Sequence, residues 1–316
     1  MGLSRAAKAD LWFVVVTLLA AAGWIFSKEA ILLMPPLLFI SLRFLLAGMV
    51  LTMVGFRQVK ALSWNQYRQS IFVGAIFSFG TCFWVMGLYS GVSISVGVFL
   101  TSLAVIMVPL LSRVLFKEKP PRSTWFSIPV AVIGLAILTL KSDLSIETGQ
   151  LFFLAASFFF GIFFIYNTRA ANHQEVAMLD ESINVSEKVP ALPLTAITLL
   201  VVGVIAAAVS LYMEPWQPTF TDFSLELLFW VSASALVGTA LRFFIQTHAQ
   251  SLSTHSHGVV IMVVEPIWTA CLAAAWFDES LSQTDLMGCS LIFLSIVINR
   301  WPLISGLFRF LNKTTT

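Results

Sequence analysis

Charged residues are scarce in this chain. Only 11% of its 316 residues are Asp, Glu, Lys or Arg, whereas 58% are hydrophobic. A soluble protein of this length needs many more charges to cover its surface. The net charge is +2, and no stripe of Lys and Arg with interleaved aromatic residues is present. The composition therefore excludes an ordinary water-soluble domain and argues against nucleic-acid binding.

Cysteines are also few, and the motifs of common catalytic sites are missing. Cys82, Cys271 and Cys289 all fall within apolar stretches, without the paired spacing of a metal site or a disulfide framework. The chain has no His-rich metal motif, nucleophile elbow, phosphate loop or Walker motif. The acids inside the apolar stretches also lack the spacing of an aspartyl dyad. We therefore expect neither an enzyme nor an ATP-driven pump, and no cofactor or metal.

Long apolar stretches recur between Leu11 and Pro302, and they dominate the sequence. Each runs for roughly 18 to 24 residues, which is enough for a helix to cross a hydrocarbon core of about 30 Å. Helices satisfy every backbone polar group internally, as a lipid environment requires. The predicted fold class is therefore an all-α integral membrane protein with ten transmembrane helices. These cover residues 11–33, 36–56, 70–89, 94–116, 124–140, 149–167, 192–212, 225–249, 258–277 and 284–301.

The charges between these spans sort by sign. If the N-terminus is cytoplasmic, most basic residues outside the spans lie inside, among them Arg57, Lys117 and Arg122. The other side then keeps Lys141 and a mainly acidic set that includes Asp143. Cytoplasmic loops carry an excess of Lys and Arg. We therefore predict a multi-pass protein of the cell inner (plasma) membrane with both termini in the cytoplasm.

The two halves of the chain show a weak internal repeat. At one constant offset, Phe116 and Glu118 align with Phe277 and Glu279. The first segment is basic and the second is acidic, as expected when the second copy crosses the membrane in the opposite sense. We predict two inverted five-helix repeats, residues 1–142 and 143–316, within a single transmembrane domain. Substrate sites of such proteins lie near the midplane, where the repeats meet.

The segment 170–190 is longer and more acidic than a tight turn. It carries Glu175, Asp180, Glu181 and Glu187. A solvated cytoplasmic linker between the repeats is the favoured interpretation, and a regulatory or partner-binding loop is the alternative.

Several motifs carry a family resemblance. WVMGLY at 84–89 and VPLLSRVLFKEK at 108–119 resemble the third and fourth helices of the drug/metabolite transporter superfamily. In the second half, Glu265-Pro266, FDES at 277–280 and GCSLI at 288–292 are similar to the ninth and tenth helices of its EamA-type branch. The resemblance covers nearly the whole chain. It implies a ten-helix fold of inverted repeats that moves small metabolites, often amino acids and often outward, by alternating access.

Charges inside the spans are the most informative single residues, because each costs about 2.5 to 3.5 kcal/mol at a helix centre on insertion scales. Arg242 and Glu265 lie at a similar depth, roughly 10 Å from the inner ends of their helices, so we expect them to pair. Gln246 follows Arg242 by four residues and shares its face. Two interpretations stay open, in which the pair holds two helices together or takes part in substrate binding.

Lys28, Glu29 and Arg43 fall near the outer ends of their spans. Snorkelling with an interhelical pair is the favoured interpretation, and substrate contact is the alternative. Tryptophans nearer the midplane are candidates to line a cavity suited to aromatic or amphipathic solutes. The predicted substrate-binding residues are Trp24, Lys28, Trp84, Arg242, Gln246, Glu265 and Trp268.

The function expected from these features is secondary transport of a small amphipathic metabolite, an amino acid or a related compound, by alternating access. Export is favoured over import. The alternative is a channel or a ligand-binding membrane receptor without active transport, whose pore or pocket would use the same buried charges. The expected partners are a small-molecule substrate and the lipid bilayer, with a proton as the candidate coupling ion. The sequence specifies neither the substrate nor the oligomeric state.

Overall fold

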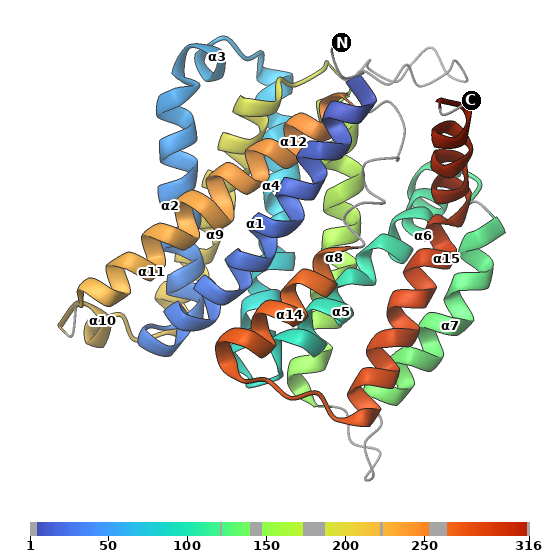
Figure 1. The fold of residues 1–316 in the computed structure, drawn as a ribbon. Helices are drawn as coiled ribbons and strands as arrows, with labels where there is room; N and C mark the ends of the chain where they lie inside the picture. Colours follow the sequence, from blue (N-terminus) through green and yellow to red (C-terminus); the bar gives the residue numbers. More distant parts are fainter. Residues whose placement is uncertain are drawn as a thin grey trace.

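The computed structural model describes residues 5–120, 122–139, 147–172, 187–221, 224–252 and 264–314, and every regular element within these ranges is a helix (Figure 1). The helices are α1 (Arg5–Leu33), α2 (Pro36–Val54), α3 (Phe56–Lys60), α4 (Trp64–Tyr89), α5 (Ile94–Ser102), α6 (Ala104–Phe116), α7 (Arg122–Thr139), α8 (Thr148–Ala171), α9 (Ala191–Met213), α10 (Gln217–Thr221), α11 (Leu225–Ala235), η1 (Leu236–Leu241), α12 (Arg242–Leu252), α14 (Glu265–Phe277) and α15 (Gln283–Thr314).

Seven helical stretches in the described residues are long and apolar enough to cross a membrane. They are Leu11–Leu33, Pro36–Val54, Trp64–Tyr89, Ile94–Phe116, Thr148–Ala171, Ala191–Met213 and Leu225–Ser251. Two shorter apolar helices, Arg122–Ile137 and Gln283–Asn299, coincide with the predicted fifth and tenth spans. The ninth predicted span begins outside the described residues and continues as α14. The predicted all-α membrane class is thus confirmed.

The fourth predicted span is broken into α5 and α6, and Pro109 lies inside α6. A proline has no N–H, so it leaves the carbonyl four residues earlier without its helical donor. Here that carbonyl belongs to Val105, and it accepts a hydrogen bond from Asn299 Nδ2 at 3.2 Å. The Asn299 Oδ1 atom accepts a further bond from Thr124 Oγ1 at 2.8 Å. A single amide of α15 therefore ties α6 and α7 together.

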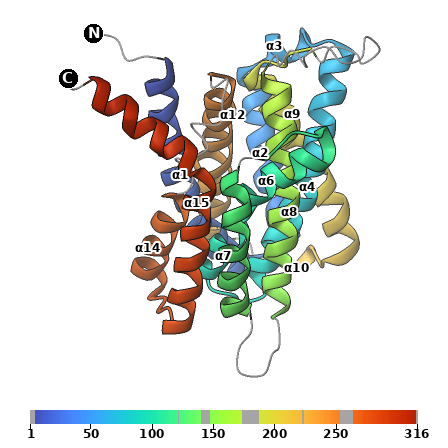
Figure 2. The ribbon, with the colours of Figure 1, turned by 90° about the vertical axis from the view of Figure 1, so that its right-hand side faces the viewer.

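The helices form a bundle in which segments far apart in the sequence lie side by side (Figure 2). The most extensive packing joins α2 to α9, α7 to α15 and α4 to α8. The α2–α9 contact is close because each helix presents a glycine. A Cβ added to Gly48 would lie 2.8 Å from the backbone nitrogen of Leu200, and one added to Gly203 would lie 2.7 Å from that of Leu45. Small residues let membrane helices approach in this way.

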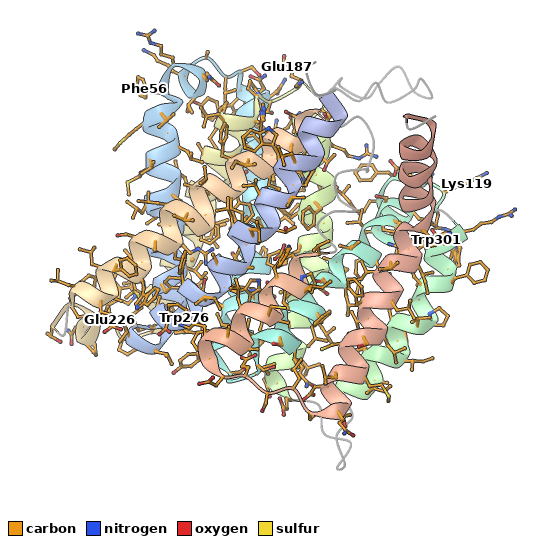
Figure 3. All side chains as sticks on the ribbon, in the orientation of Figure 1. Phe56, Lys119, Glu187, Glu226, Trp276 and Trp301 are labelled. Carbon is orange, nitrogen blue, oxygen red and sulfur yellow. The ribbon has the colours of Figure 1, made fainter. Side chains whose placement is uncertain are left out.

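The start of α1 and the end of α15 lie at the same end of the bundle, together with α3, whereas α10 lies at the opposite end (Figure 1). The side-chain view agrees: Phe56 and Glu187 lie toward the end with the termini, and Glu226 and Trp276 lie toward the other (Figure 3). The two ends are called the terminal end and the far end below. This placement is consistent with the prediction that both termini lie on one side of the membrane.

Two acidic residues cap helices that belong to the other half of the sequence. The Glu214 carboxylate accepts hydrogen bonds from the backbone N–H groups of Leu37 and Leu38 at 2.9 and 2.8 Å, at the start of α2. The Glu279 carboxylate accepts from the N–H groups of Ile94 and Ser95 at 2.8 and 3.2 Å, at the start of α5. The first N–H groups of a helix lack intrahelical partners and attract negative charge. These contacts join the two halves of the chain at the far end.

Candidate functional site

A cavity of about 110 Å³ lies inside the bundle, between helices from both halves of the sequence. Its walls come from α1, α2, α4, α5, α6, α8, α12 and α14. Ligand sites are typically apolar cavities with a few placed polar groups. The polar and charged side chains of this lining are Arg43, Thr81, Thr101, Ser102, Arg242, Gln246 and Glu265. The described residues contain no group of His, Cys, Asp and Glu side chains that could hold a metal ion.

Aromatic rings form much of the apolar wall. Trp24 and Trp84 meet edge to face, with ring centroids 4.9 Å apart. Phe77 stacks on Phe163 at 4.1 Å and meets Phe243 at 5.0 Å. Each ring is held by another ring, so the wall keeps its shape without a ligand. Such a surface offers a large contact area to an apolar or aromatic solute.

Arg242 and Glu265 contact each other in the lining of this cavity, and the predicted pair is present. The Arg242 Nη2 atom lies 3.5 Å from Glu265 Oε2, and the two side chains are 18% and 14% exposed. Charge-assisted hydrogen bonds are usually shorter, about 2.7 to 2.9 Å, and Arg often binds a carboxylate through two of them. This pair makes one long contact instead.

Two polar atoms of the cavity are buried without a hydrogen-bond partner among the described residues. They are Arg242 Nε, a donor, and Gln246 Oε1, an acceptor. Gln246 lies one turn after Arg242 on α12, as the sequence predicted. An unpaired buried polar group is unfavourable and is rare in folded proteins. The cavity therefore offers both a donor and an acceptor to a polar group of a ligand or to water.

Arg43 also lines the cavity, although it was predicted to lie near the outer end of its span and not among the site residues. It is only 4% exposed. Its guanidinium donates from Nε to Thr239 Oγ1, from Nη1 to Ser27 Oγ at 2.6 Å and from Nη2 to the Gly238 carbonyl at 3.2 Å. All three acceptors are neutral. In the part of the chain that the structure describes, no carboxylate forms an ion pair with Arg43.

The position of Arg43 depends on the π-helical segment η1. The wider turn places Gly238 and Thr239 where both accept from one guanidinium, and Thr239 Oγ1 in turn donates to the carbonyl of Ser234 at 2.9 Å. α1 crosses η1 closely, since a Cβ added to Gly238 would lie 3.0 Å from Gly23 Cα. This crossing brings Ser27 to the same guanidinium. Single π turns inside longer helices often occur at functional sites.

Lys28 and Trp268 were predicted as site residues, and the structure places both away from the cavity lining. Lys28 Nζ instead donates to the Leu88 carbonyl at 3.3 Å, in the last turn of α4. A cation near the C-terminal carbonyls of a helix interacts favourably with the helix dipole. The Trp268 side chain is 40% exposed and faces outward from the bundle. Of the seven predicted residues, the structure brings together Trp24, Trp84, Arg242, Gln246 and Glu265.

Polar contacts flank the cavity at both ends. Toward the far end, Leu88 lies one turn beyond the cavity residue Trp84, and its contact with Lys28 joins α1 to α4. Toward the terminal end, Asn167 lies one turn beyond the cavity residue Phe163, and its Nδ2 donates to Gln250 Oε1 at 2.7 Å. This second contact joins α8 to α12. Polar interhelical contacts therefore lie on both sides of the cavity along the bundle axis.

Comparison with known proteins gives matches of two kinds. The model of the EamA-like transporter family matches the chain twice, over residues 7–140 and 147–301. A solved structure titled only "Crystal structure of protein" has a TM-score of 0.65 at 16% identity, over 94% of this chain and 98% of that one. At that identity the likeness shows the fold alone. No curated protein matches the sequence.

Proposed function

Because this chain belongs to the EamA-like transporter family, of the drug/metabolite transporter superfamily, we propose that it carries a small amphipathic metabolite across the inner membrane by alternating access. The observation that carries this proposal is the cavity between the two halves. It combines a rigid aromatic wall with an ion pair that makes only one long contact. The substrate is an amino acid or a related compound. Export is the proposed direction, and a proton is the proposed coupling ion.

We propose that the scaffold is two inverted five-helix repeats. The family model supports this, because it matches each half separately. The backbone supports it too. Lys117 and Asp278, which align at the same offset as Phe116 and Phe277, are the only non-glycine residues with positive φ in the described parts of the chain, at 57° and 51°. Each ends its helix in the left-handed conformation. Unrelated side chains with the same uncommon backbone geometry are expected of two copies of one ancestral unit.

The packing agrees with this arrangement. In the proposed repeat, α2 corresponds to α9 and α7 to α15, and each of these pairs packs together. The contact of α4 with α8 corresponds to the contact of α1 with the segment α11, η1 and α12, and both are present. A two-fold relation between the halves requires such reciprocal contacts.

Alternating access requires the cavity to open to one side at a time. The Lys28 to Leu88 contact and the Asn167 to Gln250 contact are suited to serve as the two closures, because each joins different helices on one side of the cavity. A channel would need a path open at both ends. Contacts on both sides of the cavity are therefore compatible with a carrier and not with a permanently open channel.

Reconstituted protein tests carrier function. A thermal-shift panel of amino acids, nucleosides, cationic amines and vitamins first identifies ligands, because a ligand that binds the folded state raises its stability. The best ligand is then used for counterflow in liposomes. We expect saturable uptake of labelled ligand that is accelerated by unlabelled ligand inside the vesicles. Flux that rises linearly with concentration and ignores the internal ligand would contradict a carrier and support a channel.

We also predict that the terminal end faces the cytoplasm. The test uses a background in which Cys82, Cys271 and Cys289 are replaced by Ala, with a single new cysteine at Lys60 on α3 or Gln217 on α10. Both positions are exposed and lie at opposite ends of the bundle. On intact cells, a membrane-impermeant maleimide should label the cysteine at 217 and spare the one at 60 until the cells are permeabilised. The reverse pattern would show that the orientation is wrong.

A further inference from the structure

We propose that the cavity selects a substrate with one net negative charge, a small organic carboxylate with an apolar body, and that the carboxylate binds Arg43. This proposal deepens the transport function proposed above. It rests on that function only in calling the bound molecule a substrate. The binding itself is a separate property of the cavity. Four observations carry it: the charge balance of the cavity, the free donors of Arg43, the surrounding rings and the unpaired polar atoms opposite.

The charge balance comes first. Among the described residues, the charged side chains that line the cavity are Arg43, Arg242 and Glu265. Glu265 pairs with Arg242, so the charge of Arg43 is left over. The charged neighbour that acts on Arg43 is Arg242, which is also a cation. Residues 253–263, which precede α14 and are not described, contain no Asp or Glu. The side chains that line the cavity thus carry an excess of one positive charge.

A guanidinium stays protonated in proteins, so Arg43 cannot relieve this excess by losing a proton. Burying a charge without a counter-ion is costly. The neutral acceptors around Arg43 satisfy hydrogen bonds but supply no negative charge. A bound anion would supply it. A zwitterion would leave the excess unchanged, and a cation would add to it.

The remaining donors of Arg43 fit a carboxylate. Nη1 and Nη2 each carry two N–H groups, and each uses one in the structure, so one donor stays free on each nitrogen. N–H groups on both terminal nitrogens of one guanidinium can bind the two oxygens of a carboxylate. Lys28, the other predicted cationic site residue, is engaged at Leu88 outside the cavity lining. Arg43 is therefore the anion contact that the cavity provides.

The surroundings of Arg43 define the rest of the ligand. Its guanidinium carbon lies 5.5 Å from the centroid of Phe44 and 5.8 Å from that of Trp84, and Trp84 in turn contacts Trp24. A carboxylate on Arg43 therefore has its attached group against aromatic rings. The free donor Arg242 Nε and the free acceptor Gln246 Oε1 could both bond to a hydroxyl group on the same ligand. An aromatic or aliphatic carboxylic acid without an amino group fits these contacts, so within the proposed substrate class the related compound is favoured over the amino acid itself.

The test compares ligands that differ only in charge. Phenyl, indolyl and isobutyl compounds are each used as the carboxylic acid, the amino acid and the amine, and their binding to the purified protein is measured by calorimetry and by thermal shift. We expect the acid of at least one set to bind about tenfold or more tightly than its amino acid, and the amine to bind most weakly. Amino acids or amines that bind more tightly than the acids would overturn the proposal, as would binding by none of the acids.

Variants then locate the anion. Arg43→Gln should weaken the best acid about tenfold or more while changing amine binding little, and Arg43→Lys should weaken the acid less, because it keeps the charge but has only one nitrogen. Arg113→Gln is the matched control, since Arg113 is exposed and lies outside the cavity lining. An Arg43→Gln protein that still unfolds cooperatively and binds the acid like the wild type would overturn the assignment. If the Arg43→Gln protein does not fold, an unchanged affinity of the Arg43→Lys protein for the acid overturns the assignment instead.

These outcomes separate the two proposals. If acids bind through Arg43 but no ligand gives counterflow, the transport function fails and the anion site stands. If counterflow occurs with amines and is unaffected by Arg43→Gln, the anion site fails and the transport function stands.

Discussion

Glu265→Gln is expected to lower the transport rate about tenfold or more, with a much smaller effect on the amount of folded protein. The variant keeps the shape of the side chain but removes its charge. Arg242 then loses its counter-ion in a cavity that already holds Arg43. The wild-type pair makes a single contact of 3.5 Å, which is longer than a usual charge-assisted hydrogen bond, so its own contribution to stability is modest.

We propose that substrate or a proton competes for this pair as the protein moves between its two open states, because alternating access needs a contact that differs between them. Transport by the wild type should then vary with pH, and transport by Glu265→Gln should vary less. The measurement is counterflow across a pH series in liposomes, with the unfolding temperature of each purified variant beside it. Glu226→Gln is the matched control, since Glu226 lies on α11 outside the cavity lining.

The double variant Glu265→Gln with Arg242→Gln sharpens the test. Two residues that act as one unit show strongly non-additive effects, so the double variant should lose little more than the worse single variant. Normal transport by Glu265→Gln would disprove the coupling role. A loss of activity that only parallels a loss of folded protein would make Glu265 a structural residue.

Trp24→Ala and Trp84→Ala are each expected to weaken ligand binding about tenfold, which corresponds to about 1.4 kcal/mol. Each change removes one ring of the edge-to-face pair and its contact area with the ligand. The dissociation constant from calorimetry is the readout. Trp268→Ala is the matched control, because the same substitution is made on a side chain that faces outward. It should leave the affinity unchanged.

Removing a buried Trp also costs stability, about 3 to 5 kcal/mol for a change to Ala. Trp84→Phe therefore accompanies the Ala variants, since it keeps an aromatic face and should give an intermediate affinity. Unchanged binding in folded Trp24→Ala and Trp84→Ala would show that the ligand does not contact this wall. Equal losses in all three Ala variants would point to a general effect of Trp removal on the fold.

The helices could be predicted from the sequence, because the length of each apolar stretch can be read directly from it. Their ends could not be predicted in this way. α4 begins at Trp64 rather than Ser70, since Ser63 and Gln66 form a capping box that extends the helix into polar sequence. The break at η1 was not predicted either. Hydrophobicity does not distinguish a π turn from an α turn, because both leave the same residues in the same stretch.

The site residues could be predicted where their depth along a helix determines whether they meet. Counting residues from the helix ends placed Arg242 level with Glu265, and the four-residue spacing placed Gln246 on the same face. Depth does not give rotation about the helix axis, which is why Trp268 was chosen with Trp24 and Trp84 yet faces outward. Arg43 was missed for a related reason. Its acceptors come from α1 and η1, and no spacing within α2 reveals them.

The π turn of η1 has a consequence for how the eighth span can move. A π turn holds one residue more than an α turn, and each residue of an α-helix advances the chain by about 100° of rotation and 1.5 Å of rise. If η1 were rewound as an α-helix, α12 would turn by about that angle relative to α11. Arg242 and Gln246 share one face of α12, so both would swing away from Glu265 together. Winding and unwinding of this one turn would thus move Arg242 and Gln246 toward and away from Glu265, while α11 stays in place.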